Sequence, residues 1–137
     1  MVEMELARIL ITDTSEGQII VLREKNGSRS FPIVIGYFEA AAIDRHVKEI
    51  QTPRPLTHDL LRSVIASMGG TLEHIIVNEL ANETFYARLI ISRDGKKLSV
   101  DSRPSDAIAL AVLESKPIFV EETVLDQVCG HPFPEIE

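Results

Sequence analysis

The 137-residue sequence has few of the residues that build disulfide frameworks, aromatic binding platforms or membrane spans. Its single cysteine, Cys129, excludes an internal disulfide and fits a reducing cytoplasm. Two tyrosines, five phenylalanines and no tryptophan leave few rings on which unpaired bases of nucleic acid can stack. No apolar run approaches the ~20 residues of a membrane span. No charged segment followed by an apolar one opens the chain, so we expect no signal peptide.

Positive charge is also scarce in this sequence. Its 14 Lys and Arg residues stand against 21 Asp and Glu residues, which gives a net charge of −7. This balance disfavours broad nonspecific binding to nucleic acid, because such binding is mostly neutralisation of phosphates by Lys and Arg. It is compatible with an acidic site whose charge a metal ion cancels. The phosphate-binding loop and the patterns GxGxxG, HExxH, paired CxxC and GxSxG are all absent.

The remaining composition is that of one globular domain spanning residues 1–137. Apolar residues make up 45% and charged residues 26%, both usual values for a globular protein with one core. Periodicity predicts strands over residues 4–11, 18–24, 28–36, 71–80, 85–92, 96–101 and 117–120. It predicts helices over 37–50, 56–68 and 104–114, and a last helical turn at 122–129 within a C-terminal segment, 121–137.

Turn signals predict where hairpins form, and apolar stripes predict which helix faces are buried. Asn26-Gly27 and Asp94-Gly95 each lie between two apolar runs and predict hairpins, since type I′ turns need a positive φ at both central residues. The apolar stripes of the first two helices, which we expect to face the core, are Ala40, Ile43, Val47 and Ile50, and then Leu56, Leu60, Leu61, Val64, Ile65 and Met68.

Two segments, residues 21–43 and 89–110, share one plan. Each is predicted to form a strand, an Asn-Gly or Asp-Gly turn, a second strand, and a helix that opens with an acid before small apolar residues. Glu39 of the first segment corresponds to Asp106 of the second. We therefore predict an α+β fold: a single domain with a mixed or antiparallel sheet, helices packed on it, and an internal duplication of a β-hairpin–helix unit.

The segment DSRPSDAIAL, residues 101–110, concentrates charge at the start of an apolar helix. Ser102 or Ser105 can cap this helix, and Asp106 suits its first turn, where the helix dipole favours negative charge. Asp101 and Arg103 are further charged residues that a helix cap does not need. Because the apolar run implies a buried helix, we expect its charged head to lie at a cleft or to be paired.

Two further helix starts carry candidate residues. His58 lies at the border of the second helix's apolar stripe, where it is either a packed histidine or a general base or metal ligand. Asp59 points to the polar side of that helix. Glu39 flanks the first helix's stripe and either compensates the helix dipole or contributes to a site. His46 lies about 10 Å farther along that helix, too far from Glu39 to share a metal ion.

Three separated motifs carry a family resemblance: IVIGYFEAAAI at 33–43, RPLTHDLL at 54–61 and DSRPSDAIALA at 101–111. Together they resemble the bifunctional nuclease family, also known as the DUF151 domain, over nearly the whole chain. The resemblance implies a small mixed α/β domain, association into homo-oligomers of two or more copies, and activity on both DNA and RNA, as reported for plant members. It supplies no catalytic residues, so the candidates are the polar residues inside the motifs: Glu39, His58, Asp59, Asp101, Arg103 and Asp106.

The first hypothesis is a metal-dependent nuclease that hydrolyses phosphodiester bonds of DNA or RNA. The expected ligands of Mg²⁺ or Mn²⁺ are Asp101, Asp106 and Glu39, with Asp59 as a further acid in the catalytic group. His58 acts as the base, and Arg103 clamps the phosphate.

The alternative is a non-enzymatic interaction domain in which the motif residues form a structural ion-pair network, such as Arg103 with Glu39 or Asp59. An Arg103 paired inside the fold without an open cleft favours this alternative. A shared pocket with converging carboxylates favours the nuclease.

Overall fold

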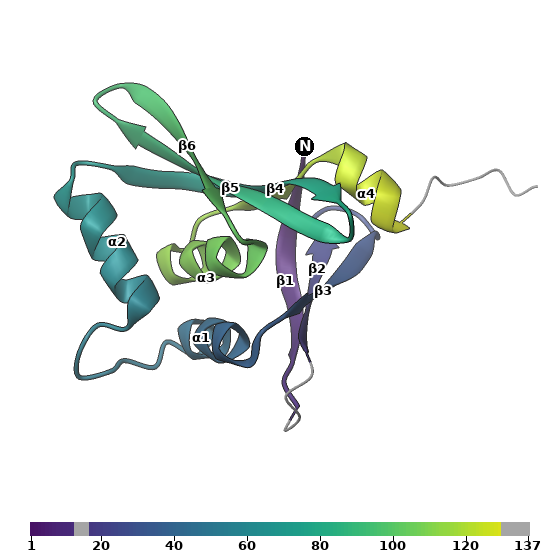
Figure 1. Cartoon of the computed structure of the whole chain (residues 1–137), viewed down its shortest axis with the longest axis horizontal. Helices are drawn as coiled ribbons and strands as arrows, with labels where there is room; N and C mark the ends of the chain where they lie inside the picture. The colour runs from purple at the N-terminus through teal and green to yellow at the C-terminus, as the bar shows by residue number, and fades with distance from the viewer. Residues whose placement is uncertain (13–16, 130–137) are drawn as a thin grey trace, which may run out of the picture.

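Seven strands form one mixed sheet in the computed structural model, which describes residues 1–12 and 17–129 (Figure 1). The strands are β1 (Val2–Leu10), β2 (Gln18–Glu24), β3 (Ser30–Ile35), β4 (Thr71–Ala81), β5 (Thr84–Arg93), β6 (Lys96–Ser102) and β7 (Ile118–Val120). Their order is β3-β2-β1-β7-β4-β5-β6, and every pair is antiparallel except β4 and β7. The helices are α1 (Tyr37–Val47), α2 (Thr57–Ser67), α3 (Pro104–Glu114) and α4 (Glu122–Cys129). The predicted α+β class is confirmed.

The two halves of the chain build similar units on either side of β7. Strands β1, β2 and β3 form an antiparallel meander that leads into α1, and β4, β5 and β6 form a second meander that leads into α3. The predicted hairpin–helix repeat therefore corresponds to β2-β3-α1 and β5-β6-α3. As a result, Glu39 and Asp106 both lie in the first turn of the helix that follows a meander.

One of the two predicted hairpin turns is of the expected type. Asp94 and Gly95 have φ of 52° and 76°, as a two-residue type I′ turn requires. The type I′ prediction for Asn26-Gly27 is wrong, because neither residue has a positive φ. That hairpin closes over five residues, 25–29, since the Glu24 carboxylate accepts a hydrogen bond from the Arg29 N–H at 2.9 Å.

Helix α1 ends at Val47, three residues before the predicted end. Glu49 adopts a left-handed φ of 56°, and the N–H of Ile50 donates to the carbonyl of Arg45 at 3.1 Å, which closes the helix end. Ala40 and Ile43 are buried as predicted, whereas Val47 and Ile50 are exposed. The second half of the predicted stripe, at the end of α1 and just after it, therefore does not face the core.

Helix α2 buries only part of its predicted stripe. Leu61 and Ile65 pack against the core, and His58 beside them is buried. The other members of the stripe, spaced four residues apart along one edge of α2, are exposed: Leu56, Leu60, Val64 and Met68. We call these four residues the α2 apolar edge.

Helix α3 forms the centre of the core, as its apolar sequence predicted. Residues 107–111 have no exposed surface, and α3 packs against α1, α2, β4 and β5 (Figure 1). The rings of Phe31 on β3 and Phe85 on β5 lie 5.7 Å apart. The two meanders therefore contact each other directly, in addition to their pairing with β7. No described helix is long and apolar enough to cross a membrane. The tail beyond Cys129, with His131, lies outside the described residues.

Candidate functional site

The first turns of three helices meet around the Asp106 carboxylate. His58 of α2 approaches one oxygen of this carboxylate with Nε2 at 3.0 Å, and Arg103 donates from Nε to the other at 2.9 Å. A terminal nitrogen of Arg103 also donates to Oε2 of Glu39 on α1 at 3.1 Å. The structure therefore brings together four of the six predicted site residues, which we call the motif cluster: Glu39, His58, Arg103 and Asp106.

The start of α3 differs from the predicted cap. Arg103 occupies the N-cap position in an extended conformation, no side chain caps the helix, and Pro104 stands at the first helical position. The capping prediction for Ser102 or Ser105 is wrong. Ser102 donates its hydroxyl hydrogen to the carbonyl of Arg103 at 2.8 Å, and Ser105 is buried. The N-cap position instead aims the Arg103 side chain across the first turn, onto Asp106.

The motif cluster carries opposite charges that stabilise each other. Burial raises the pKa of Asp106, but hydrogen bonds from Arg103 and His58 outweigh burial and hold this pKa below its ordinary 3.8. The hydrogen bond to Asp106 raises the pKa of Arg103. Both groups are therefore ionised at neutral pH. The Arg103 side chain is 63% exposed, whereas His58 is only 7% exposed, so the cluster runs from the surface into the protein.

A second histidine, His46 of α1, lies next to His58. The two rings are edge-to-face with centroids 6.0 Å apart, and His46 is 8% exposed, with no partner for Nε2 among the described residues. Burial first, and the charge of Arg45 second, lower the pKa of His46 below 6.5, so its ring is neutral at pH 7. No spacing in the sequence relates His46 to His58, because their contact depends on how α1 and α2 pack.

The structure does not bring Asp59 and Asp101 into the motif cluster. Asp59 accepts a hydrogen bond from the N–H of Leu56 at 2.9 Å and so stabilises the start of α2. Asp101 is 73% exposed, with its carboxylate 3.6 Å from Arg88. Asp101 and Arg88 are paired across β5 and β6, so both point to the same face of the sheet. That face is opposite to the one on which Leu89 is buried.

The predicted metal ligands do not converge in one chain. Within the described ranges, no three His, Cys, Asp or Glu side chains are close enough to one another to hold a metal ion. Glu39 and Asp106 lie on either side of the Arg103 guanidinium, which already contacts both carboxylates. The described residues therefore do not fit a preformed site for Mg²⁺ or Mn²⁺, ions that need several oxygen ligands.

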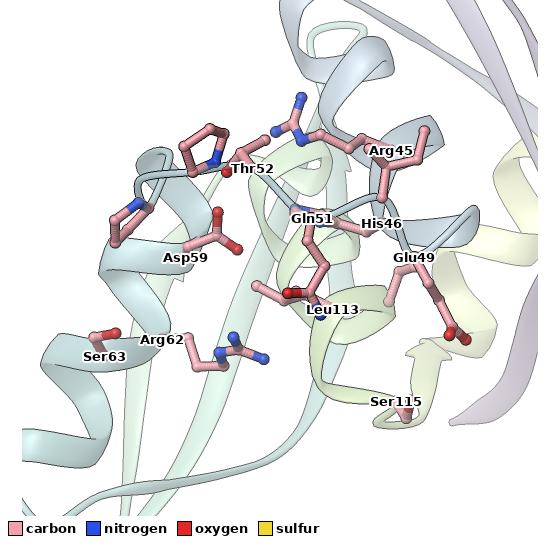
Figure 2. Close-up of a pocket in the computed structure, with 14 residues that line it drawn as sticks. Arg45, His46, Glu49, Gln51, Thr52, Asp59, Arg62, Ser63, Leu113 and Ser115 are labelled. Atoms are coloured by element: carbon pink, nitrogen blue, oxygen red, sulfur yellow. The ribbon is translucent and has the colours of Figure 1, made fainter.

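A pocket of about 540 Å³ opens beside the motif cluster, between the end of α1, the segment before α2, α2 itself and the end of α3 (Figure 2). Asp59 and Arg62 project into it from α2, and Arg45 and His46 line it from α1 (Figure 2). Glu39, Arg103 and Asp106 do not line it. No sequence pattern singles out Arg45 or Arg62, because an arginine on a helix surface is usually solvated.

Comparison with known proteins matches the bifunctional nuclease domain model to residues 20–131. An uncharacterised protein of Mycobacterium tuberculosis strain H37Rv is 42% identical over 125 residues, which cover 91% of this chain and 74% of that protein. Bifunctional nuclease 1 of Oryza sativa subsp. indica is 25% identical over 118 residues, 83% of this chain and 36% of that protein. Bifunctional nuclease 2 of Arabidopsis thaliana is 29% identical over 107 residues, 75% of this chain and 32% of that protein.

The chain thus spans about a third of the length of these plant relatives. The domain match includes all three sequence motifs and every residue of the motif cluster. Because this match covers most of the chain, the protein belongs to the bifunctional nuclease domain family.

Proposed function

We propose that this protein is a nuclease that hydrolyses phosphodiester bonds of DNA, RNA or both. The observation that carries the proposal is the contact chain Arg103–Asp106–His58, in which one carboxylate joins an exposed guanidinium to a buried imidazole. Family membership and the printed names of the plant relatives support the same class of reaction.

Arg103 is the proposed phosphate-binding residue. Its contacts to Asp106 and Glu39 use Nε and one terminal nitrogen, and its other terminal nitrogen has no partner among the described residues. The guanidinium is exposed, so a phosphate oxygen can reach the remaining donors. A guanidinium binds phosphate through several hydrogen bonds at once and stabilises the negative charge that develops during hydrolysis.

His58 is the proposed general base. With Nε2–H donated to the Asp106 carboxylate, Nδ1 keeps its lone pair and can remove a proton from an attacking water. Asp106 orients the ring and stabilises the imidazolium that forms, as the acid does in a Ser-His-Asp triad. The tautomer follows from the hydrogen bond, because an ionised carboxylate only accepts hydrogen bonds. Attack of the water on phosphorus breaks one P–O ester bond, and the leaving oxygen departs as an alcohol after it takes the proton from the His58 imidazolium.

Whether cleavage requires Mg²⁺ or Mn²⁺ is tested in the assay below. Glu39 and Asp106 are the acidic residues of the motif cluster, but both already contact Arg103, and the described residues add no third ligand. We therefore derive no step of the reaction through a metal ion.

The interaction domain is the second candidate function, and one observation favours it. Arg103 contacts both Glu39 of α1 and Asp106 of α3, so the ion pairs connect two helices as a structural network does. In that case these residues affect only the stability of the domain, and its function lies in binding a partner.

A cleavage assay separates the two candidates. Purified protein is incubated with end-labelled single- and double-stranded DNA and RNA, with Mg²⁺, Mn²⁺ or EDTA. We expect His58→Gln to lose at least ~100-fold in rate, the usual contribution of a positioned acid–base group. We expect a similar loss in Arg103→Gln, because it removes a donor that stabilises charge in the transition state. Arg88→Gln is the matched control, because it removes an arginine that pairs with an aspartate outside the motif cluster. Equal rates in folded His58→Gln and wild-type protein would contradict the proposal, and so would no cleavage under any condition.

The proposal also includes a homo-oligomer in the cytoplasm. The α2 apolar edge exposes four large apolar side chains on one helix, which a second copy of the chain can cover. Cys129 is the single cysteine of the chain and is free, as expected in a reducing compartment. Light scattering of wild type and Leu60→Glu tests the oligomer, and a monomeric wild type would contradict it.

A further inference from the structure

The pocket beside the motif cluster carries two arginines that the proposed reaction does not use. Arg45 lies in the last turn of α1 and Arg62 lies on α2, and both line the same cavity (Figure 2). Arg45 has no ion-pair partner among the described residues. Arg62 contacts Glu114 only loosely, with Nε 3.5 Å from the carboxylate. Their terminal nitrogens are therefore available to an anion.

Both arginines line the same pocket as one buried side chain, His46. Burial lowers the pKa of His46 most, the charges of Arg45 and Arg62 lower it further, and the charge of Asp59 raises it. His46 lines the same pocket, and its Nε2 is buried without a partner in the described structure. An unsatisfied polar atom beside two available guanidinium groups is an arrangement that a polar, negatively charged ligand stabilises.

The rest of the pocket wall suits a flat, partly apolar group. The apolar residues on it come from the segment before α2 and from the end of α3: Ile50, Pro53, Pro55, Val112 and Leu113. Asp59 and Glu49 add carboxylates that can accept hydrogen bonds from an amino group. The cavity of about 540 Å³ falls within the range of small-molecule sites. Two arginines, an apolar part of the wall and hydrogen-bond acceptors together match a nucleotide.

We propose that this pocket binds one nucleotide of the nucleic-acid strand, with Arg45 and Arg62 on its phosphate and its base against Ile50 and the prolines. The inference rests on the proposed nuclease function, because it places this nucleotide next to the one whose phosphate Arg103 binds. The edge-to-face contact between His46 and His58 joins the two sites, since His46 lines the pocket and His58 belongs to the motif cluster.

Calorimetric binding of adenosine 5′-monophosphate and of inorganic phosphate tests this site. We expect the nucleotide to bind more tightly than phosphate, and Arg45→Gln and Arg62→Gln each to weaken nucleotide binding by about tenfold or more, the effect of losing one charge-assisted hydrogen bond. Lys48→Gln is the matched control: it removes a positive charge just after α1 at a residue that does not line the pocket, and we expect less than a twofold change.

Three results would overturn the inference: no detectable nucleotide binding, equal affinity in the Arg45→Gln/Arg62→Gln double variant, or phosphate binding as tightly as the nucleotide. A second readout uses the His46 imidazole, because a phosphate near it stabilises the charged ring. We expect the nucleotide to raise the pKa of His46 in an NMR titration, and an unchanged titration would place the ligand elsewhere.

The same variants distinguish failure of this site from failure of the nuclease. We expect His58→Gln to bind the nucleotide like wild type while losing cleavage, which supports both proposals. Arginine-dependent binding in a protein that cleaves no substrate would refute the nuclease and leave the nucleotide site standing. Cleavage that depends on His58, with nucleotide binding that is independent of Arg45 and Arg62, would refute the pocket alone.

Discussion

The substitution Asp106→Ala tests how strongly the Asp106 carboxylate holds α2 against α3. Removing the carboxylate leaves Nε2–H of His58, which is 7% exposed, without an acceptor. An unsatisfied buried donor costs about 1–3 kcal/mol. Arg103 loses less, about 0–1 kcal/mol, because its side chain is 63% exposed and water replaces the lost contact. We therefore expect the free energy of unfolding to fall by about 2 kcal/mol.

Differential scanning calorimetry at pH 7 measures this loss. The entropy of unfolding of a 137-residue chain is roughly 0.3 kcal/mol/K, so Tm falls by about 7 °C. Asp101→Ala is the matched control, because the same atoms are removed from a carboxylate that is 73% exposed. We expect that control to change stability by less than about 0.5 kcal/mol. Equal decreases of Tm in the two variants would refute the assignment of Asp106 as a structural link.

The pH dependence of the stability difference between wild type and an Asp106 variant provides an independent check. The pKa of Asp106 is lower in the folded protein than its ordinary 3.8, so the folded state favours the ionised carboxylate. The resulting stabilisation is fully present above pH 3.8 and is lost as the pH falls through the folded-state pKa. The stability gap between wild type and Asp106→Asn should therefore narrow in acid. A gap that stays constant well below pH 3.8 would contradict the lowered pKa.

Three further outcomes follow from the structure. Hydrogen bonds from Arg29 lower the pKa of Glu24 to about 2, so its carboxyl should titrate near that value by NMR, and Arg29→Gln should return it toward 4.5. Burial lowers the pKa of His46 below 6.5, so the unfolded state binds a proton more readily than the folded state. The free energy of unfolding should therefore fall as the pH drops below 6.5. Urea titrations of His46→Gln should show a smaller fall. Leu110→Ala, at a side chain with no exposed surface, should cost about 2–5 kcal/mol in urea unfolding, and a loss under about 1 kcal/mol would count against its place in the core.

Local features of the fold were predictable because they depend on neighbouring residues. The Asp94-Gly95 turn forms because both residues tolerate positive φ, and the apolar run after Pro104 forms a helix buried on all sides. The Asn26-Gly27 turn shows the limit of such signals. There the Glu24 carboxylate accepts a hydrogen bond from the Arg29 N–H, and a longer loop replaces the two-residue turn.

The composition of the motif cluster was only partly predictable. The four residues that meet were all identified from the motifs, but Asp101, two residues before Arg103, lies on the other face of the sheet. Strand β6 ends at Ser102, so the strand directs the Asp101 side chain, whereas Arg103 stands at the N-cap of α3 and is directed by the start of that helix. Glu39 and Arg103 are separated by 64 positions and meet through the packing of α1 on α3.

The sequence by itself determined the α+β class, the repeated hairpin–helix plan, the buried helix α3 and the acids at the starts of α1 and α3. These follow from periodicity, turn chemistry and helix-end electrostatics, which act over a few residues. The tertiary structure alone decided that His46 packs against His58, that Arg45 and Arg62 line one pocket, and that four of the six residues of the α2 stripe are exposed. Those contacts depend on how helices distant in the chain pack around one core, and no local pattern in the sequence specifies that arrangement.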